Sequence, residues 1–154
     1  MNPILRNILA VIAGIIVELF INGTLVSVGG HFLPIPEGVD PNDIESIKAN
    51  IHLYSTKHFI APFLAHAIGT LVGAFVACKI AVSSHKMLAL VVAGFHFLGG
   101  LGMSFLLGFE PLSLTLIDLI FAYFPMAILA WKFAHPLKFA ASKENDANII
   151  DGNI

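Results

Sequence analysis

Four long apolar stretches, separated by short polar breaks, dominate the pattern of the chain. They run from about Ile8 to Val28, Phe59 to Val82, Met87 to Leu107 and Leu112 to Phe133. A helix of about 20 apolar residues crosses the hydrocarbon core of a bilayer. The pattern therefore predicts an all-α integral membrane protein, in which residues 1–135 form one bundle of four transmembrane helices.

The segments between these stretches differ in length. The breaks near Ser83–Lys86 and Gly108–Pro111 are short, so each joins antiparallel neighbouring helices. Residues 29–58 form a long first loop, in which Asp40-Pro41-Asn42-Asp43 has the pattern of an N-cap, a proline at N1 and an acid at N3. Apolar residues follow this motif at helical spacing: Ile44, Ile47 and Ile51. The loop thus predicts a short amphipathic helix, interpreted either as an interfacial helix on lipid or protein or as a gating lid.

Composition agrees with a membrane protein. The 154 residues are 57% hydrophobic and only 12% charged, whereas soluble proteins carry about 25% charged residues. The net charge is −2 and no basic stripe is present, so the expected partner is the lipid bilayer, and nucleic acid is not expected.

The lysines and arginines predict the orientation. Six fall on one side of the four-span arrangement: Arg6, Lys79, Lys86, Lys132, Lys138 and Lys143. Only Lys48 and Lys57 fall on the other side. Because positive residues accumulate in cytoplasmic segments, both termini are expected in the cytoplasm, with the protein in the cell membrane (the inner membrane in a bacterium). Residues 136–154 are polar and are expected to be a disordered tail.

Small residues indicate how the helices pack. Ala65, Gly69 and Gly73 recur every four residues on the second span, which allows another helix to approach closely. Packing within the chain is favoured over homodimerisation through this stripe. Gly99-Gly100 marks a hinge or kink in the third span, and Pro125 is expected to kink the fourth.

Four ionisable residues interrupt the apolar spans: Glu18, His66, His96 and Asp118. Each intramembrane acid costs about 2.5–3.5 kcal/mol on insertion scales. Helical rise places all four about 9–17 Å from the outer ends of their spans, within one layer. Asn22 and Thr70 follow Glu18 and His66 by four residues, so each shares a helix face with its partner.

This polar layer allows three kinds of chemistry. Glu18, His66 and Asp118 can bind a divalent metal through oxygen and imidazole ligands, although the sequence identifies no cofactor. Carboxylates and histidines can also handle protons. Alternatively, a buried pair such as His66 and Asp118 only holds the bundle together. His85 and His135 lie near lysines at the inner ends of their spans and are expected to have no chemical role.

Motifs of hydrolases, nucleotide-binding proteins and redox proteins are missing from the sequence, which weakens an enzyme reading. The first hypothesis is a protein that binds or translocates protons or a small polar solute. Since four spans are few for a lone transporter, it is expected to be a homo-oligomer. The alternatives are a membrane-embedded enzyme, with or without metal, and a structural or accessory subunit.

Overall fold

The computed structural model describes residues 2–135, and this range contains helices joined by turns, without a strand. The long helices are α1 (Pro3–Phe32), α3 (Ile60–Ile80), α4 (His85–Leu106), α5 (Leu112–Phe121) and α6 (Phe124–Ala134). Four helical segments are long and apolar enough to cross a membrane, with α5 and α6 together forming the fourth. The predicted all-helical fold with four such segments is confirmed, whereas the predicted tail, residues 136–154, lies outside the described range.

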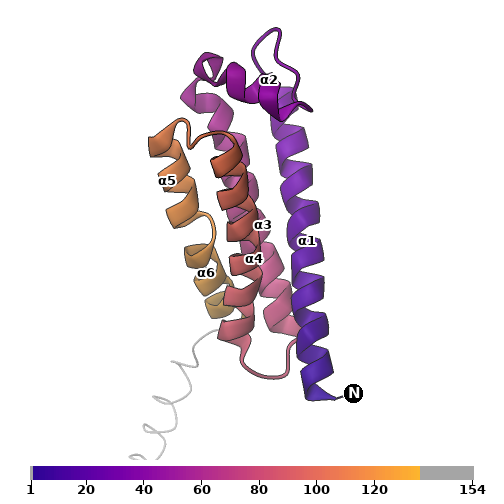
Figure 1. Ribbon diagram of the computed structural model, residues 1–154. Coiled ribbons are helices and arrows are strands. Elements are labelled where there is room, and N and C mark those ends of the chain that lie inside the picture. The colour runs from indigo at the N-terminus through magenta and orange to yellow at the C-terminus, as the bar shows by residue number, and fades with distance from the viewer. Residues whose placement is uncertain (1, 136–154) are drawn as a thin grey trace, which may run out of the picture.

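Helix α3 is the centre of the bundle. It contacts α1, α4 and α6, and α1 runs beside it over most of its length (Figure 1). Helices α5 and α6 follow one another end to end on the side of the bundle away from α1 (Figure 1). The N-terminus lies at the same end as the turn between α3 and α4 (Figure 1).

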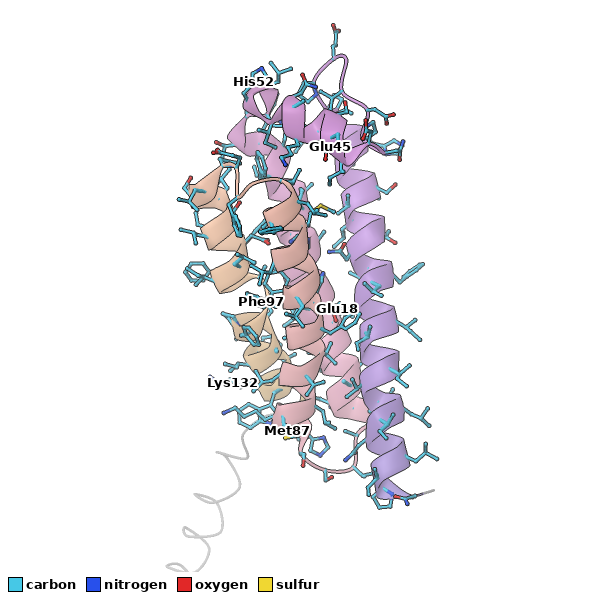
Figure 2. The ribbon with its side chains drawn as sticks, viewed as in Figure 1. Glu18, Glu45, His52, Met87, Phe97 and Lys132 are labelled. Carbon is cyan, nitrogen blue, oxygen red and sulfur yellow. The ribbon has the colours of Figure 1, made fainter. Side chains whose placement is uncertain are left out.

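Small side chains fill the interior, and large apolar side chains point outward. The main core cluster is rich in alanine and includes Ala74, Ala89, Ala93 and Ala127, each fully buried. Leucine, isoleucine and phenylalanine side chains project from the outer faces of the helices, as on α1 in Figure 2. This distribution differs from that of a soluble domain, where large apolar side chains fill the core.

The contact between α1 and α3 is a close approach of two backbones. A Cβ atom added to Gly73 would lie 2.6 Å from the carbonyl oxygen of Gly14, and one added to Gly14 would lie 2.7 Å from that of Gly73. Gly69 also faces α1, near the backbone of Glu18, and Ala65 is fully buried on the same helix. The small-residue stripe of α3 therefore lies against a helix of its own chain.

The fourth span is divided rather than merely bent. Helix α5 ends at Phe121 and α6 begins at Phe124, with Pro125 in its first turn. Proline has no N–H to donate and its ring clashes with the carbonyl four residues earlier, which explains a break just before it. Helix α4, in contrast, continues through Gly99 and Gly100 without interruption, so the hinge expected there is not a break in the helix.

The helix in the first loop, α2 (Ile44–Ala49), begins later than predicted. Its N-cap is Asp43, whose carboxylate accepts from the N–H of Glu45, whereas the Asp40 carboxylate accepts from the N–H of Asn42 in the preceding turn. The prediction of an N-cap at Asp40 was therefore wrong, because Asp40 stabilises a turn. Two short 3-10 helices, η1 (Ile51–Leu53) and η2 (Thr56–Phe59), complete the loop. The amphipathic role of α2 stays a prediction.

Candidate functional site

An acid and a histidine form the most buried part of a polar network near the middle of the bundle. Glu18 lies on the buried stripe of α1 with Ala10 and Gly14, four residues apart, and is 0% exposed. Its Oε1 lies against Nδ1 of His96 on α4. Neither carboxylate oxygen accepts a regular hydrogen bond from the described residues. A fully buried carboxylate without such bonds is costly unless it holds a proton or a partner.

Two further polar groups fix the His96 ring. The Thr70 hydroxyl lies 2.9 Å from Nδ1, and the Asn22 side-chain amide lies 3.2 Å from Nε2. One neutral tautomer accounts for these contacts, with the Nδ1 proton facing Glu18 and Thr70 and Nε2 accepting from Asn22. Helices α1, α3 and α4 therefore all contribute to this half of the network.

His66, Asp118 and Tyr123 form the second half. Nδ1 of His66 lies 2.9 and 3.0 Å from the two carboxylate oxygens of Asp118. The Tyr123 hydroxyl donates to Asp118 Oδ2 at 2.9 Å and lies 3.1 Å from His66 Nδ1. Within residues 2–135, His66 Nε2 forms no hydrogen bond.

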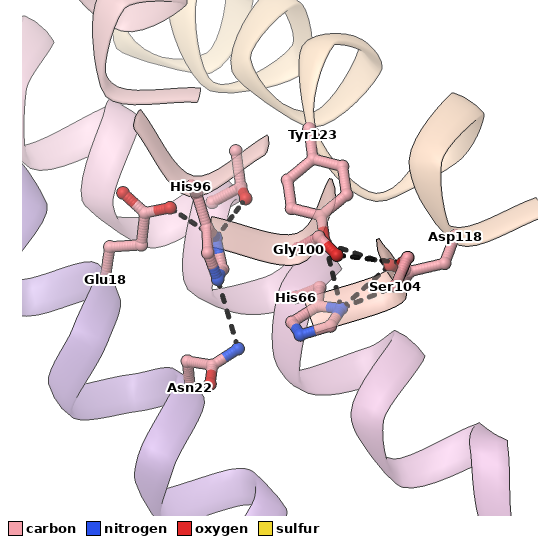
Figure 3. A network of polar contacts seen from close by, with 9 residues as sticks. Glu18, Asn22, His66, His96, Gly100, Ser104, Asp118 and Tyr123 are labelled. Atoms are coloured by element: carbon pink, nitrogen blue, oxygen red, sulfur yellow. Dashed lines mark hydrogen bonds and ion pairs between the residues drawn. The ribbon is translucent and has the colours of Figure 1, made fainter. Parts of the chain in front are cut away.

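Ring contacts join the two halves, as Figure 3 shows. The His66 and His96 rings meet edge to face with centroids 5.3 Å apart. The Tyr123 ring also lies 5.6 Å from His66 and 5.2 Å from His96. All six polar residues predicted from the sequence, from Glu18 to Asp118, therefore converge in one region of the bundle.

Tyr123 was missed in the sequence analysis. It follows Asp118 by five residues, which places the two side chains on different faces of a continuous helix. The break before α6 gives Tyr123 non-helical dihedral angles (φ −116°, ψ −85°) and brings its hydroxyl back to Asp118. Gly100 makes room for that hydroxyl, because an added Cβ would collide with it. The nearest sequence signal was Pro125, which predicts irregular backbone at this place.

Exposure rises across the network. Glu18 is fully buried and His96 is 7% exposed, whereas the side chains of His66 and Asp118 are 23% and 16% exposed. The network therefore has a closed end at α1 and a partly open end at α3 and α5.

The predicted metal ligands do not form a common set. Glu18 pairs with His96, while His66 pairs with Asp118 in the other half. Among residues 2–135, no group of three or more histidine, cysteine, aspartate or glutamate side chains is placed to hold a metal ion. The three residues considered as possible metal ligands, Glu18, His66 and Asp118, therefore do not meet as one set in this structure, because each acid lies against a different imidazole.

The class of the protein follows from this geometry: an all-helical chain with four helices able to cross a membrane and a polar network between them. Comparison with known protein families, characterised proteins and solved structures finds no match.

Proposed function

We propose that this protein resides in a membrane and binds and moves protons through the network that joins Glu18 to Asp118. The observation that carries the proposal is the fully buried Glu18 carboxylate, which faces His96 and has no regular hydrogen bond from the described residues. A proton on this acid removes the cost of a buried charge. Without that proton, the carboxylate is stabilised by the Nδ1–H that His96 turns toward it.

The open end of the network suits proton entry. His66 Nδ1 lies against the Asp118 carboxylate, and Nε2 has no hydrogen bond from residues 2–135. A proton accepted at Nε2 allows the Nδ1 proton to pass to Asp118, so the ring returns to a neutral form.

The remaining step is proton transfer across the gap between the two imidazoles of His66 and His96. No hydrogen bond joins the two halves in the described structure, and the His66 and His96 rings are in contact with centroids 5.3 Å apart. A rotated ring or one water molecule would bridge that separation. Tyr123 contacts both rings, so it is the side chain that must move or yield when the bridge forms.

Transport across a membrane needs an enclosed path, and four helices alone enclose little space for one. We therefore propose a homo-oligomer in the cell membrane. Multi-angle light scattering or native mass spectrometry of the purified protein would measure the number of copies, and a strict monomer would contradict this part of the proposal.

The proposed orientation places both termini in the cytoplasm, based on the bias of Lys and Arg. Reporter fusions after Ser84 and Ala147 should report the cytoplasm, and one after Asp43 should report the outside. An outside signal from the Ala147 fusion would mean an odd number of spans.

Proton flux tests the function directly. The purified protein would be reconstituted into liposomes that contain a pH-sensitive dye, and a potassium diffusion potential would drive protons inward. We expect the wild type and Glu45→Gln, an exposed change in α2, to acidify the lumen at equal rates. Glu18→Gln should fall to the rate of protein-free liposomes. Equal flux in Glu18→Gln and wild type, or no flux in the wild type, would overturn the proposal.

A further inference from the structure

A second histidine pair lies at the end of the bundle where the chain begins. His85 is the first residue of α4, and His135 directly follows α6. Their ring centroids are 4.3 Å apart with an interplanar angle of 54°. Among the described residues, His85 is half-buried and His135 is exposed. The sequence analysis expected no chemical role for either residue.

Backbone carbonyls fix the protonation pattern of both rings. His85 Nδ1 lies 3.0 Å from the carbonyl oxygen of Cys78, and His135 Nδ1 lies 3.2 Å from that of Trp131. A carbonyl oxygen only accepts, so each Nδ1 must carry the proton. In the neutral imidazoles, both Nε2 atoms then keep their lone pairs. Histidine ligands of metals use this arrangement, in which one ring nitrogen donates to a carbonyl and the other binds the ion.

Lysine side chains surround the histidine pair. Lys79 reaches the carbonyl oxygen of Ala134, next to His135, at 2.9 Å. Lys86 follows His85 directly and lies over the Trp131 ring, 5.4 Å from its centroid, while Lys132 is exposed on the last turn of α6. No carboxylate pairs with either histidine within residues 2–135.

We propose that His85 and His135 bind one divalent transition-metal ion through their two Nε2 atoms. Metal–nitrogen bonds of about 2.0–2.1 Å bring the centres of two such rings to within about 5 Å of each other. Imidazole suits Zn²⁺, Ni²⁺ and Cu²⁺, whereas Mg²⁺ and Ca²⁺ require oxygen ligands. Water completes the coordination, and the bound ion connects the start of α4 to the end of α6.

This site is separate from the Glu18–Asp118 network. It uses no residue of that network and lies at the end of the bundle marked in Figure 2 by Met87 and Lys132, which are close in sequence to His85 and His135. A test of this site therefore does not depend on whether the network moves protons.

Asparagine variants provide the sharpest test. The amide nitrogen of asparagine takes the place of Nδ1, so His85→Asn and His135→Asn keep a donor for the carbonyl and remove Nε2. His31 supplies the matched control, because its Nδ1 also lies near a carbonyl one turn back, that of Ser27, at 2.9 Å. It has no second imidazole beside it in the described structure.

The measurement is Zn²⁺ binding to the purified full-length protein without a histidine tag, in competition with a chromophoric chelator. We expect one ion per chain. Each asparagine variant should lower the affinity at least about tenfold, the double variant should abolish binding, and His31→Asn should match the wild type. The Cu²⁺ electron paramagnetic resonance spectrum should show two nitrogen ligands, reduced to one in either single variant.

The result that would overturn the site is equal Zn²⁺ affinity in the wild type and in the double variant. Failure of the wild type to compete with the chelator would overturn it as well. Helicity and melting temperature of the metal-free proteins control for folding. Saturating Zn²⁺ should raise the melting temperature of the wild type but not of the double variant, because only a folded site binds the ion.

Discussion

Gly73 lies directly against Glu18, since a Cβ added to this glycine would be 2.6 Å from the Cβ of the acid. The buried carboxylate and the close packing of α1 on α3 are therefore one structural feature. A larger residue at position 73 would push α1 away and move Glu18 from His96.

Gly73→Ala should destabilise the protein and disturb the network. The new methyl group would also meet the Gly14 carbonyl at 2.6 Å, and backbone cannot move aside as a flexible side chain can. Overpacking of this kind costs about 1–3 kcal/mol. Thermal melts in detergent would measure the loss.

Gly94→Ala is the matched control for that substitution. Gly94 lies inside α4 with nothing within 4 Å of an added Cβ. Alanine is favoured over glycine within a helix by about 1 kcal/mol, so this variant should be neutral or slightly more stable. A Gly73→Ala melt equal to that of Gly94→Ala would show that α1 and α3 do not pack as described.

Tyr123→Phe should weaken the open half of the network. It removes the hydroxyl that donates to Asp118 Oδ2 at 2.9 Å, and hydrogen bonds to charged groups contribute about 1.5–3 kcal/mol. Tyr54→Phe, in the first loop, should leave the melting temperature unchanged, since the Tyr54 hydroxyl has no hydrogen bond from the described residues. The same melting temperature for both variants would place the Tyr123 hydroxyl outside the network.

Sequence reasoning predicted the spans and the polar layer because both depend on regular helical geometry. Glu18, His66, His96 and Asp118 each lie within an apolar run, and helical rise alone brings them to similar depth. Regular helical geometry could not predict the role of Tyr123, since this side chain reaches Asp118 only because the helix ends between the two residues. The sequence also did not predict which of the four residues pair. Helical rise gives the depth of a residue along the bundle, but not which residue of another helix it faces.

The loop helix and the second histidine pair show the same limit. Asp40 has the features of an N-cap, but its carboxylate accepts from Asn42 in a turn, and the helix begins after Asp43. His85 and His135 are 50 positions apart in sequence and touch only because α4 begins where α6 ends. Contacts between helix ends depend on the turns, which periodicity does not describe.

Double-mutant cycles should reveal two coupled pairs. Residues in contact give interaction energies of about 0.5–3 kcal/mol, whereas distant residues are additive. We expect coupling of Asp118→Asn with His66→Ala and of Glu18→Gln with His96→Ala, while Asp118→Asn with Glu45→Gln serves as the additive control. A weaker coupling of Glu18→Gln with His66→Ala is expected through the His96 ring.

Whether the single substitutions raise or lower the melting temperature distinguishes a proton-handling role of the network from a structural one. If the network handles protons, Glu18→Gln and Asp118→Asn should leave the melting temperature unchanged or raise it, because the amides avoid a buried charge and functional sites often reduce stability. Coupled amide variants that melt earlier would favour a structural or accessory subunit. Additive effects in all pairs would contradict a shared network.

The most direct test of the central claim is whether Glu18 exchanges a proton with the medium. Infrared difference spectra of the reconstituted protein, recorded between about pH 5 and about pH 8, cover the range in which histidine networks exchange protons. We predict a carbonyl-stretch band of a protonated carboxyl group that changes with pH, disappears in Glu18→Gln and persists in Glu45→Gln. A spectrum in which Glu18→Gln and wild type show the same carboxyl bands would contradict the proposed proton-binding network.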